Sequence, residues 1–350
     1  MSNHITIGMD LGDKNHIAVI LDAEGNELGV HKVSNTKISV ERFFKKYSGS
    51  TVAIEAGTHS PWISRLLERL GCRVYVGNPY KLRVIWDSTD KSDERDARML
   101  AMVCRMEPRF LWPIQHRALE AHNDLEVIKA RDILVQSRTK LINHVRSVVK
   151  GIGERLPACS TESFASRVIN LLPESLHPAL MPLIDTISDM TCKIKDLDKQ
   201  IKRLATEKYP ETRRLDQVAG VGPVTALTYV LTLEDPTRFT KSRMVGPYLG
   251  LTPRRDQSGN TDKQLRITKA GNVYLRKLLV GCAHYIMGPF GSDSDLRRHG
   301  MGIAARGGKN ARKRAAVAVA RKLSVLLHQL WISGEAYEPL YVSMKVKKAA

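Results

Sequence analysis

The sequence is poor in cysteine, in acidic residues relative to basic ones, and in long apolar runs. Its five cysteines stand far apart and form no Cys-x-x-Cys pair, which excludes a disulfide framework or a cysteine zinc site and favours a reducing compartment. The longest apolar run, residues 315–331, falls short of a membrane span because Arg321, Lys322 and His328 interrupt it. The N-terminus lacks the pattern of a signal peptide. We therefore expect a cytoplasmic protein without a membrane partner.

The shortage of acidic residues gives the 350-residue chain a formal net charge of +19, which is typical of proteins that bind a polyanion. This excess is uneven, because residues 1–110 carry a net charge of +2 and residues 111–350 carry +17. A hydrophobic content of 43% supports packed cores and excludes global disorder. The uneven charge predicts that the first third holds cations through carboxylates and the rest holds a polyanion.

Apolar segments of the first third alternate as strands do. Strands are expected at 5–11, 17–21, 27–33, 51–55 and 73–76, and helices at 39–47, 62–70 and 92–106. Three strands in hairpin succession, followed by alternating helices and strands, follow the order of an RNase H-like fold. We therefore predict an α/β RNase H-like (RuvC-like) domain over residues 1–110.

Four carboxylates of this domain are candidates for a metal site. Asp10 and Glu55 each end a predicted strand beside a crevice, and Asp93 and Asp96 share one face of a predicted helix. Converging carboxylates repel one another unless cations lie between them. Mg²⁺ prefers hard oxygen ligands, and two such ions can activate attack and stabilise the leaving oxygen in phosphoryl transfer.

Each of these carboxylates also has a structural interpretation. An aspartate at a strand end is usually a turn former, and acidic residues in the first turn of a helix complement its dipole. Asp87 and Asp90 continue the three-residue spacing and could be helix caps. The set of four in this strand order is a stronger signal than any member alone.

The middle of the chain, residues 111–210, is predicted to be a coiled-coil helical region. Apolar residues with alternating spacings of three and four form a heptad seam. They are Leu180, Leu183, Ile187, Met190, Ile194, Leu197, Ile201 and Leu204. A second helix is expected at about 118–150. The two could pair with each other or with another subunit.

The remainder is predicted to be a mainly α-helical domain over 211–335, followed by a basic tail over 336–350. Residues 215–227 indicate a helix, a tight glycine turn and a helix. This pattern resembles a helix-hairpin-helix, whose backbone N–H groups approach a phosphate, and an ordinary helix–helix turn explains it equally well. A helix is expected to open within 267–277, and another to run from about 306–314 to 331.

Residues 250–260 have the composition of a loop. Taken alone, Ser258 in this loop is expected to be a turn residue, because the local motif contains no histidine to activate it as a nucleophile. The basic residues around and after it are of nearly one sign, which favours contact with nucleic acid over a merely solvated face. The candidates are Arg254, Arg255, Lys269, Arg276, Lys277, Lys309, Arg312, Lys313 and Arg314.

Several short motifs together resemble the DEDD transposases of bacterial insertion sequences, which are related to the Piv DNA invertases. The matching motifs are Gly8-Met9-Asp10, Ile54-Glu55, residues 91–97, Gly250-Leu251-Thr252-Pro253, Gln257-Ser258-Gly259 and residues 269–276. The resemblance covers about residues 5–331. Ser92 stands where threonine is common in the family, a conservative difference at a helix cap.

The resemblance implies more than the residues do. It makes Asp10, Glu55, Asp93 and Asp96 the tetrad that binds Mg²⁺, as two ions, and Ser258 the nucleophile that forms a phosphoserine linkage with DNA. It also implies a RuvC-like domain, a coiled coil and a C-terminal transposase domain. The implied partners are donor and target DNA, a non-coding guide RNA (bridge RNA) that pairs with both, and further copies of the chain in a dimer or tetramer.

The leading hypothesis is therefore an RNA-guided transposase that cuts and rejoins DNA with Mg²⁺ and a serine. One alternative is a metal-dependent, Holliday-junction-type nuclease without a covalent serine intermediate. The other is a non-catalytic nucleic-acid-binding protein whose carboxylates are caps and turn formers.

Overall fold

A computed structural model describes residues 5–82, 92–259 and 261–341. The chain divides into two compact units, Met1–Ala118 and Leu119–Ala350. Each unit has packed cores of its own.

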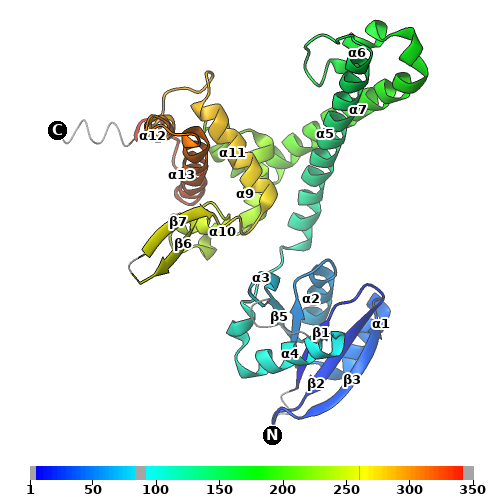
Figure 1. The fold of residues 1–350 in the computed structure, drawn as a ribbon. Coiled ribbons are helices and arrows are strands. Elements are labelled where there is room, and N and C mark those ends of the chain that lie inside the picture. The colour runs from blue at the N-terminus through cyan, green and yellow to red at the C-terminus, as the bar shows by residue number, and fades with distance from the viewer. Residues whose placement is uncertain (1–4, 83–91, 260, 342–350) are drawn as a thin grey trace, which may run out of the picture. The chain divides into compact units, whose positions relative to one another are not determined.

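The first unit is built on a mixed five-strand sheet (Figure 1). Its strands are β1 (Thr6–Asp10), β2 (Asn15–Leu21), β3 (Glu27–Ser34), β4 (Thr51–Glu55) and β5 (Arg73–Gly77). They lie in the order β3-β2-β1-β4-β5. The pairs β1–β2 and β2–β3 are antiparallel, as expected for successive hairpins, whereas β1–β4 and β4–β5 are parallel. The five strands predicted from apolar alternation therefore all form.

Helices cover both faces of this sheet. They are α1 (Lys37–Phe44), α2 (Ser60–Arg69), α3 (Pro79–Leu82) and α4 (Asp93–Met106). Successive residues of a strand point to opposite faces, so Ile7 and Met9 pack in one core with α1 and α2. The opposite face packs against α4, where Val19 of β2 meets Ala97 and Ala101. A sheet covered on both faces explains why β1 and β4 are apolar in nearly every position.

The second unit begins with two long helices, α5 (Leu119–Gly151) and α7 (His177–Glu207), which pack against each other within the chain. The short helix α6 (Phe164–Val168) lies in the connection between them and joins the same core through Phe164 (Figure 1). An ion pair between Arg131 and Asp198 also joins the two long helices. The seam predicted over residues 180–204 is therefore used inside one chain.

The buried stripe of α7 includes half of the predicted seam, Leu180, Ile187, Ile194 and Ile201, and differs from it at the alternate positions. Ile184, Thr191 and Ala205 are buried, whereas their predicted neighbours Leu183, Met190 and Leu204 are only partly buried. The physical reason is that α7 contacts more than one element. Its last turns pack against both α5 and α9, so a wider stripe than a strict heptad seam is covered.

A helical bundle completes the second unit. Its helices are α8 (Thr212–Leu215), α9 (Pro223–Leu233), α10 (Val245–Tyr248), α11 (Val273–Met287), α12 (Asp295–Ala304) and α13 (Ala311–Ser333). Short 3₁₀ helices occur in both units. In the first unit they occupy Lys45–Tyr47 and Pro108–Leu111, and in the second Ile169–Leu171, Glu174–Leu176, Pro236–Arg238 and Ser242–Met244. Between α8 and α9 the chain turns at Gly220, whose φ is +90°.

Helix α13 is the central helix of this bundle. It is long and apolar enough to cross a membrane by length and composition alone. In the structure, however, half of its most apolar window is buried, and residues such as Val319 and Leu323 pack in the core with α9 and α11. The Tyr229 hydroxyl of α9 also donates a 2.6 Å hydrogen bond to the Ser324 carbonyl. These contacts explain its apolar character as that of a core helix.

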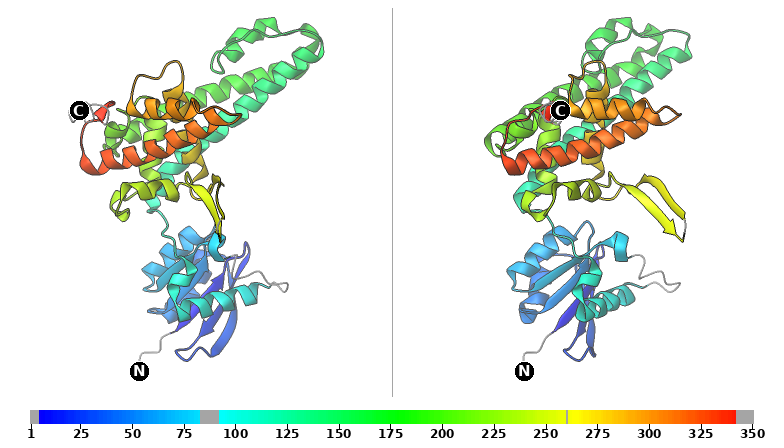
Figure 2. Two further views of the ribbon diagram at one scale, coloured as in Figure 1. Left: turned by 60° about the vertical axis from the view of Figure 1, so that its left-hand side comes forward. Right: turned by 90° about the vertical axis from the view of Figure 1, so that its left-hand side faces the viewer.

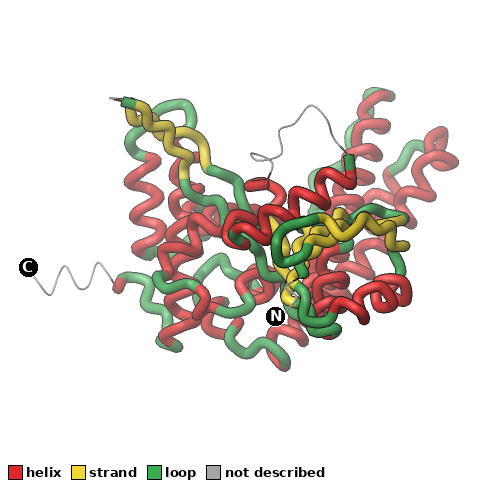
Figure 3. The backbone as a smooth tube through the Cα atoms, turned by 90° about the horizontal axis from the view of Figure 1, so that it is seen from below, coloured by secondary structure: helices red, strands yellow, loops and turns green. Residues whose placement is uncertain are grey.

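The prediction of a loop over residues 250–260 is wrong in part. This segment contains strand β6 (Pro253–Ser258), which pairs with β7 (Thr261–Ile267) in a two-stranded antiparallel ribbon. Figures 2 and 3 show the ribbon projecting from the helices of the second unit. Both of its faces are exposed, so its sequence carries no apolar alternation. That is why the residues indicated a loop.

Candidate active site

Asp10 and Glu55 end two neighbouring parallel strands. β1 and β4 pair in register up to Met9 and Ile54, so the two carboxylates occupy the next position of each strand. Gly8 of β1 faces α4, and Asp10, two residues later, faces the same way. On β4, Ala53 packs with residues of α4, which places Glu55 on that face as well. The strand register thus brings both side chains to one edge of the sheet, beneath α4.

Helix α4 lies very close to β1, and Gly8 is the residue that permits this. A Cβ atom at Gly8 would lie 2.0 Å from the carbonyl oxygen of Ala97 and 2.4 Å from the amide nitrogen of Ala101. Both distances are far below van der Waals contact, so no other residue fits here without movement of the helix. Glycine inside a strand often marks such an approach of two backbones. This signal was present in the Gly8-Met9-Asp10 motif and was not used in the sequence prediction.

The beginning of α4 is fixed by its own cap and by an ion pair. The Ser92 hydroxyl accepts a hydrogen bond from the Arg95 amide at 3.3 Å, as an N-cap residue does. Arg98, the sixth residue of the helix, pairs with Glu27 of β3 at 2.7 Å. The first turn, which carries Asp93 and Asp96, is therefore held over the sheet.

The four carboxylates interact electrostatically. The pKa of Asp10 is raised from 3.8 to about 6, first by burial of its carboxyl and then by the negative charges of Asp93, Asp96 and Glu55. A hydrogen bond from the Leu11 amide acts in the opposite direction and is the weaker influence. The structure thus brings together the four residues predicted from the sequence, which come from three separate segments. Asp87 and Asp90, the other acidic candidates, lie outside the described residues.

The side chains do not surround a vacant ion position directly. Across residues 5–82, 92–259 and 261–341, no three His, Cys, Asp or Glu side chains are close enough to hold one ion together. The hard oxygen atoms of the carboxylates suit a divalent cation. The positive charge of such a cation would offset the repulsion between carboxylates that contributes to the raised pKa of Asp10.

Ser258 is the last residue of β6 and pairs with Thr261 across the ribbon. It is exposed, and Gly259 beyond it has a φ of +51°, a left-handed conformation suited to the tight turn. Arg255 and Asp262 form an ion pair across the two strands at 2.6 Å. Ser258 belongs to the second unit, whereas the four carboxylates belong to the first.

The base of the ribbon is tightly closed. Gly250 has a φ of +66°, and a Cβ atom there would lie 2.3 Å from the Ala270 carbonyl oxygen. The guanidinium of Arg276 donates hydrogen bonds to the carbonyls of Leu249 at 2.9 Å and Ala270 at 2.7 Å. Arg276 therefore joins the two chain segments that enter and leave the ribbon, a role that sequence reasoning missed.

The predicted basic contacts lie in different surroundings. Arg276 is only 8% exposed and is directed at carbonyl groups, so its guanidinium is not part of the exposed surface. Lys277 pairs with Asp132 of α5 at 3.2 Å. The remaining seven candidates are exposed, and Arg255 also takes part in the ion pair with Asp262. They are Arg254, Arg255, Lys269, Lys309, Arg312, Lys313 and Arg314.

A mixed sheet with carboxylates at the ends of adjacent parallel strands, and more on a helix packed over them, defines an RNase H-like domain of the DEDD class. Comparison with known proteins agrees. A family model of DEDD transposases of IS110, described as "Transposase", matches residues 7–154. A second model, described as "Transposase IS116/IS110/IS902 family", matches residues 212–299.

Individual relatives support the same conclusion. The transposase for insertion sequence element IS1111A of Coxiella burnetii is 30% identical over 262 residues, covering 71% of this chain and 69% of the relative. A probable family 20 transposase of Pseudomonas aeruginosa is 26% identical over 346 residues, covering 95% of this chain and 98% of the relative. The chain belongs to the IS110/IS116/IS902 family of insertion-sequence transposases, enzymes that cleave and transfer DNA.

Proposed function

We propose that the protein cuts and rejoins DNA strands through a covalent phosphoserine intermediate at Ser258, in the presence of Mg²⁺ held by the four carboxylates. One observation carries the proposal. Asp10, Glu55, Asp93 and Asp96 come from distant segments and still lie close enough that the negative charges of the other three add to burial in raising the pKa of Asp10 to about 6. A cluster of this kind is costly without a cation and is therefore more consistent with a metal site than with unrelated caps and turns.

Asp10, Glu55, Asp93 and Asp96 would hold the ions, which family membership implies are divalent. When bound, Mg²⁺ supplies positive charge at the phosphoryl and leaving oxygens. The position of the four residues suits this role, because Asp10 and Glu55 are fixed by strand register and Asp93 and Asp96 by the capped first turn of α4. They would keep their geometry without help from a bound strand.

Ser258 would perform the covalent step. Its hydroxyl oxygen forms a bond to phosphorus, the bond from phosphorus to the sugar oxygen breaks, and the hydroxyl proton leaves as the sugar oxygen gains one. Rejoining reverses these events, as a free sugar hydroxyl displaces the serine oxygen. Bond energy is conserved in the phosphoserine, so no further energy source is needed. Exposure of Ser258 near the turn of a projecting ribbon supports this role, because such a hydroxyl can approach a phosphate.

Membership of a transposase family implies DNA as a partner. We further propose that a non-coding guide RNA pairs with donor and target DNA, and that the chain acts as a homo-oligomer in the cytoplasm. The net charge of +17 over residues 111–350 supports binding of more than one kind of nucleic acid strand. Exposed cations at the start of α13, Lys309, Arg312, Lys313 and Arg314, are suited to phosphate contacts.

Suicide DNA substrates, which lose a short fragment once cut, provide the test. The wild-type protein with Mg²⁺ should accumulate a protein–DNA adduct, and Ser258→Ala should not. Asp10→Ala should abolish cutting altogether. Free hydrolysed ends without any adduct would instead identify a metal-dependent nuclease in which Ser258 is only a turn residue.

A further inference from the structure

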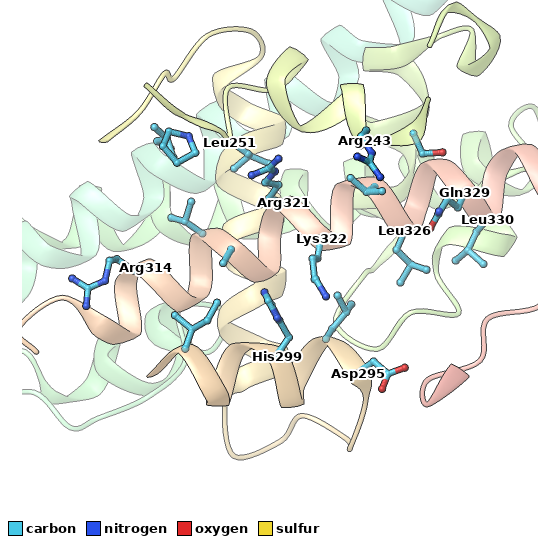
Figure 4. A pocket seen from close by; sticks show the side chains of 18 of the residues that line it. Arg243, Leu251, Asp295, His299, Arg314, Arg321, Lys322, Leu326, Gln329 and Leu330 are labelled. Carbon is cyan, nitrogen blue, oxygen red and sulfur yellow. The ribbon is translucent and has the colours of Figure 1, made fainter. Parts of the chain in front are cut away.

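A large groove in the second unit runs along α13. Its volume is about 2290 Å³, more than twice the roughly 1,000 Å³ at the upper end of small-molecule sites. Helix α12 and strand β7 contribute to its walls, and the segment Glu335–Tyr341 lies at one end. Figure 4 shows side chains of α12 and α13 that line the groove, among them His299 and Lys322. This size fits a segment of a polymer.

The groove is strongly basic. Eight lysine or arginine side chains line it, against three carboxylates. The cations are Arg243, Arg266, Lys269, Arg306, Lys313, Arg314, Arg321 and Lys322. In the described part of the chain, none of the eight forms an ion pair with a carboxylate. Their charges are therefore available to an anionic ligand.

The arrangement of these charges is visible in Figure 4. Arg321 and Lys322 extend from α13 in different directions, and His299 of α12 faces Lys322. The pKa of His299 is lowered by burial and by the positive charges of Lys322 and Arg306, which indicates a positive potential inside the groove. The three carboxylates that line the groove are Asp295, Glu335 and Glu338, and the Asp295 amide donates a 2.8 Å hydrogen bond to the Pro339 carbonyl.

The floor of the groove is apolar. Val317, Ala318, Val325 and Leu326 of α13 line the groove and each is only partly buried, and Val317 and Leu326 also pack against the edge of the core. Duplex DNA offers phosphates and paired bases, and it would leave such a floor without a contact. Unpaired bases have apolar faces that can cover it, while neighbouring arginines hold phosphates or stack on bases.

The groove is continuous with the ribbon that carries Ser258. Residues Gln264–Ile267 of β7 form part of its wall. Thr261, the pairing partner of Ser258, lies on the same strand. The seven residues of β7 span roughly 20 Å at about 3.4 Å each. A strand attached at Ser258 could therefore continue into the groove within a few nucleotides.

We propose that this groove binds single-stranded DNA next to the phosphate that Ser258 attacks. The inference rests on the proposed function, because it takes Ser258 as the point of attack. It adds that the cut strand is unpaired where it leaves the ribbon, with its bases on the apolar face of α13 and its phosphates on the arginine and lysine rim.

Binding without chemistry tests the proposal. The full chain in a chelator is titrated with fluorescent oligo(dT), with a duplex of equal length, and with oligo(rU). The groove variant is Arg321→Gln/Lys322→Gln. Its matched control, Lys309→Gln/Arg312→Gln, removes the same charge from exposed residues around the start of α13 that do not line the groove. Ala318→Gln fills the floor without a change of charge.

We expect the groove variant to weaken binding of oligo(dT) more than tenfold and to lower its log–log salt slope by about 1.4, since each lost contact to a single strand is worth about 0.7. Ala318→Gln should weaken the binding of oligo(dT) and leave the binding of the duplex unchanged. The matched control variant should change the binding of oligo(dT) and the binding of the duplex by the same factor. Melting curves like those of the wild type exclude misfolding as the cause.

Equal losses in groove and control variants would overturn the proposal, as would a loss confined to the duplex or to oligo(rU). Unchanged oligonucleotide binding in the groove variant would also overturn it. Because the chelator prevents cutting, the result is independent of the adduct experiment. Loss of the adduct with intact groove binding contradicts only the proposed function.

Discussion

Gly8 is the residue on which the carboxylate cluster depends most directly. It contributes no chemistry, yet its missing side chain lets α4 lie against β1. That contact carries Asp93 and Asp96 to the strand end where Asp10 lies. The motif Gly8-Met9-Asp10 therefore joins a packing requirement to a chemical one.

We predict that Gly8→Ala destabilises the first unit by about 1–3 kcal/mol, because the added methyl group overlaps the backbone of α4. The control is Gly57→Ala, which lies two residues after Glu55 and meets nothing within 4 Å. Chemical denaturation measures both. DNA cutting should fall strongly in Gly8→Ala and little in Gly57→Ala. Equal stability of the two variants would contradict the close packing of α4 on β1.

Asp10 gives a second prediction at this scale, because its raised pKa links stability to pH. Folded Asp10 binds its proton more tightly than the unfolded chain does, so metal-free stability falls as pH rises from 3.8 to about 6. In a chelator at neutral pH, Asp10→Asn should therefore stabilise the protein. After allowance for solvent screening, we expect about 1–2 kcal/mol.

Thermal unfolding at several pH values checks this. The gain from Asp10→Asn should disappear below the ordinary aspartate pKa of 3.8, where both states are protonated. Glu24→Gln, at an exposed turn of the same unit, should have no such effect. A variant that is less stable than the wild type at neutral pH would show that neither burial nor the neighbouring carboxylates disfavour ionised Asp10 in the folded protein.

Among the elements, those with a buried face were predictable and the ribbon was not. The central strands β1 and β4 bury nearly continuous apolar runs, and the long helices bury periodic apolar stripes, both of which the sequence displays. β6 and β7 are exposed on both faces, so their residues are mostly polar, without apolar alternation, and those of β6 resemble a loop. The ribbon owes its position to Gly250, Gly271 and Arg276, whose contacts depend on the folded bundle.

The carboxylate set was predictable for a related reason. Asp10 and Glu55 end strands that the sequence marks clearly, and Asp93 and Asp96 begin a capped helix. By contrast, the groove along α13 combines residues of α12, β7 and the C-terminal segment. No local sequence pattern predicts that residues from such distant segments line one groove. The role of Ser258 came from resemblance alone and stays a prediction.

Arg276 gives a prediction for the ribbon as an element. Its replacement by methionine leaves the carbonyls of Leu249 and Ala270 without their donor, which should loosen the ribbon base. Hydrogen exchange should accelerate at the amides of Thr268 and Lys269, which bond to Thr252 and Gly250 across that base. Lys277→Met, on the next residue, should change these amides little. If hydrogen exchange at these amides is unchanged in the Arg276 variant, Gly250 and Gly271 are sufficient to hold the ribbon in position.

At the scale of the whole molecule, charge and chemistry are divided between the units. The nearly neutral first third carries the carboxylates, and the basic remainder carries Ser258, the exposed cations of α13 and the groove. This division suits an enzyme that holds long polyanions while the carboxylates proposed to bind metal stay accessible to divalent cations. Fully basic surroundings would compete with divalent cations for the same carboxylates.

The most direct test of the account is to locate the covalent bond to DNA. Adduct formed by the wild-type protein on a suicide substrate with Mg²⁺ is digested with protease and nuclease, and the modified peptide is sequenced by mass spectrometry. The account predicts a nucleotide phosphate on Ser258, with none on the Ser258→Ala protein. A phosphate linked to another residue, or cut DNA with no linked peptide, would contradict it.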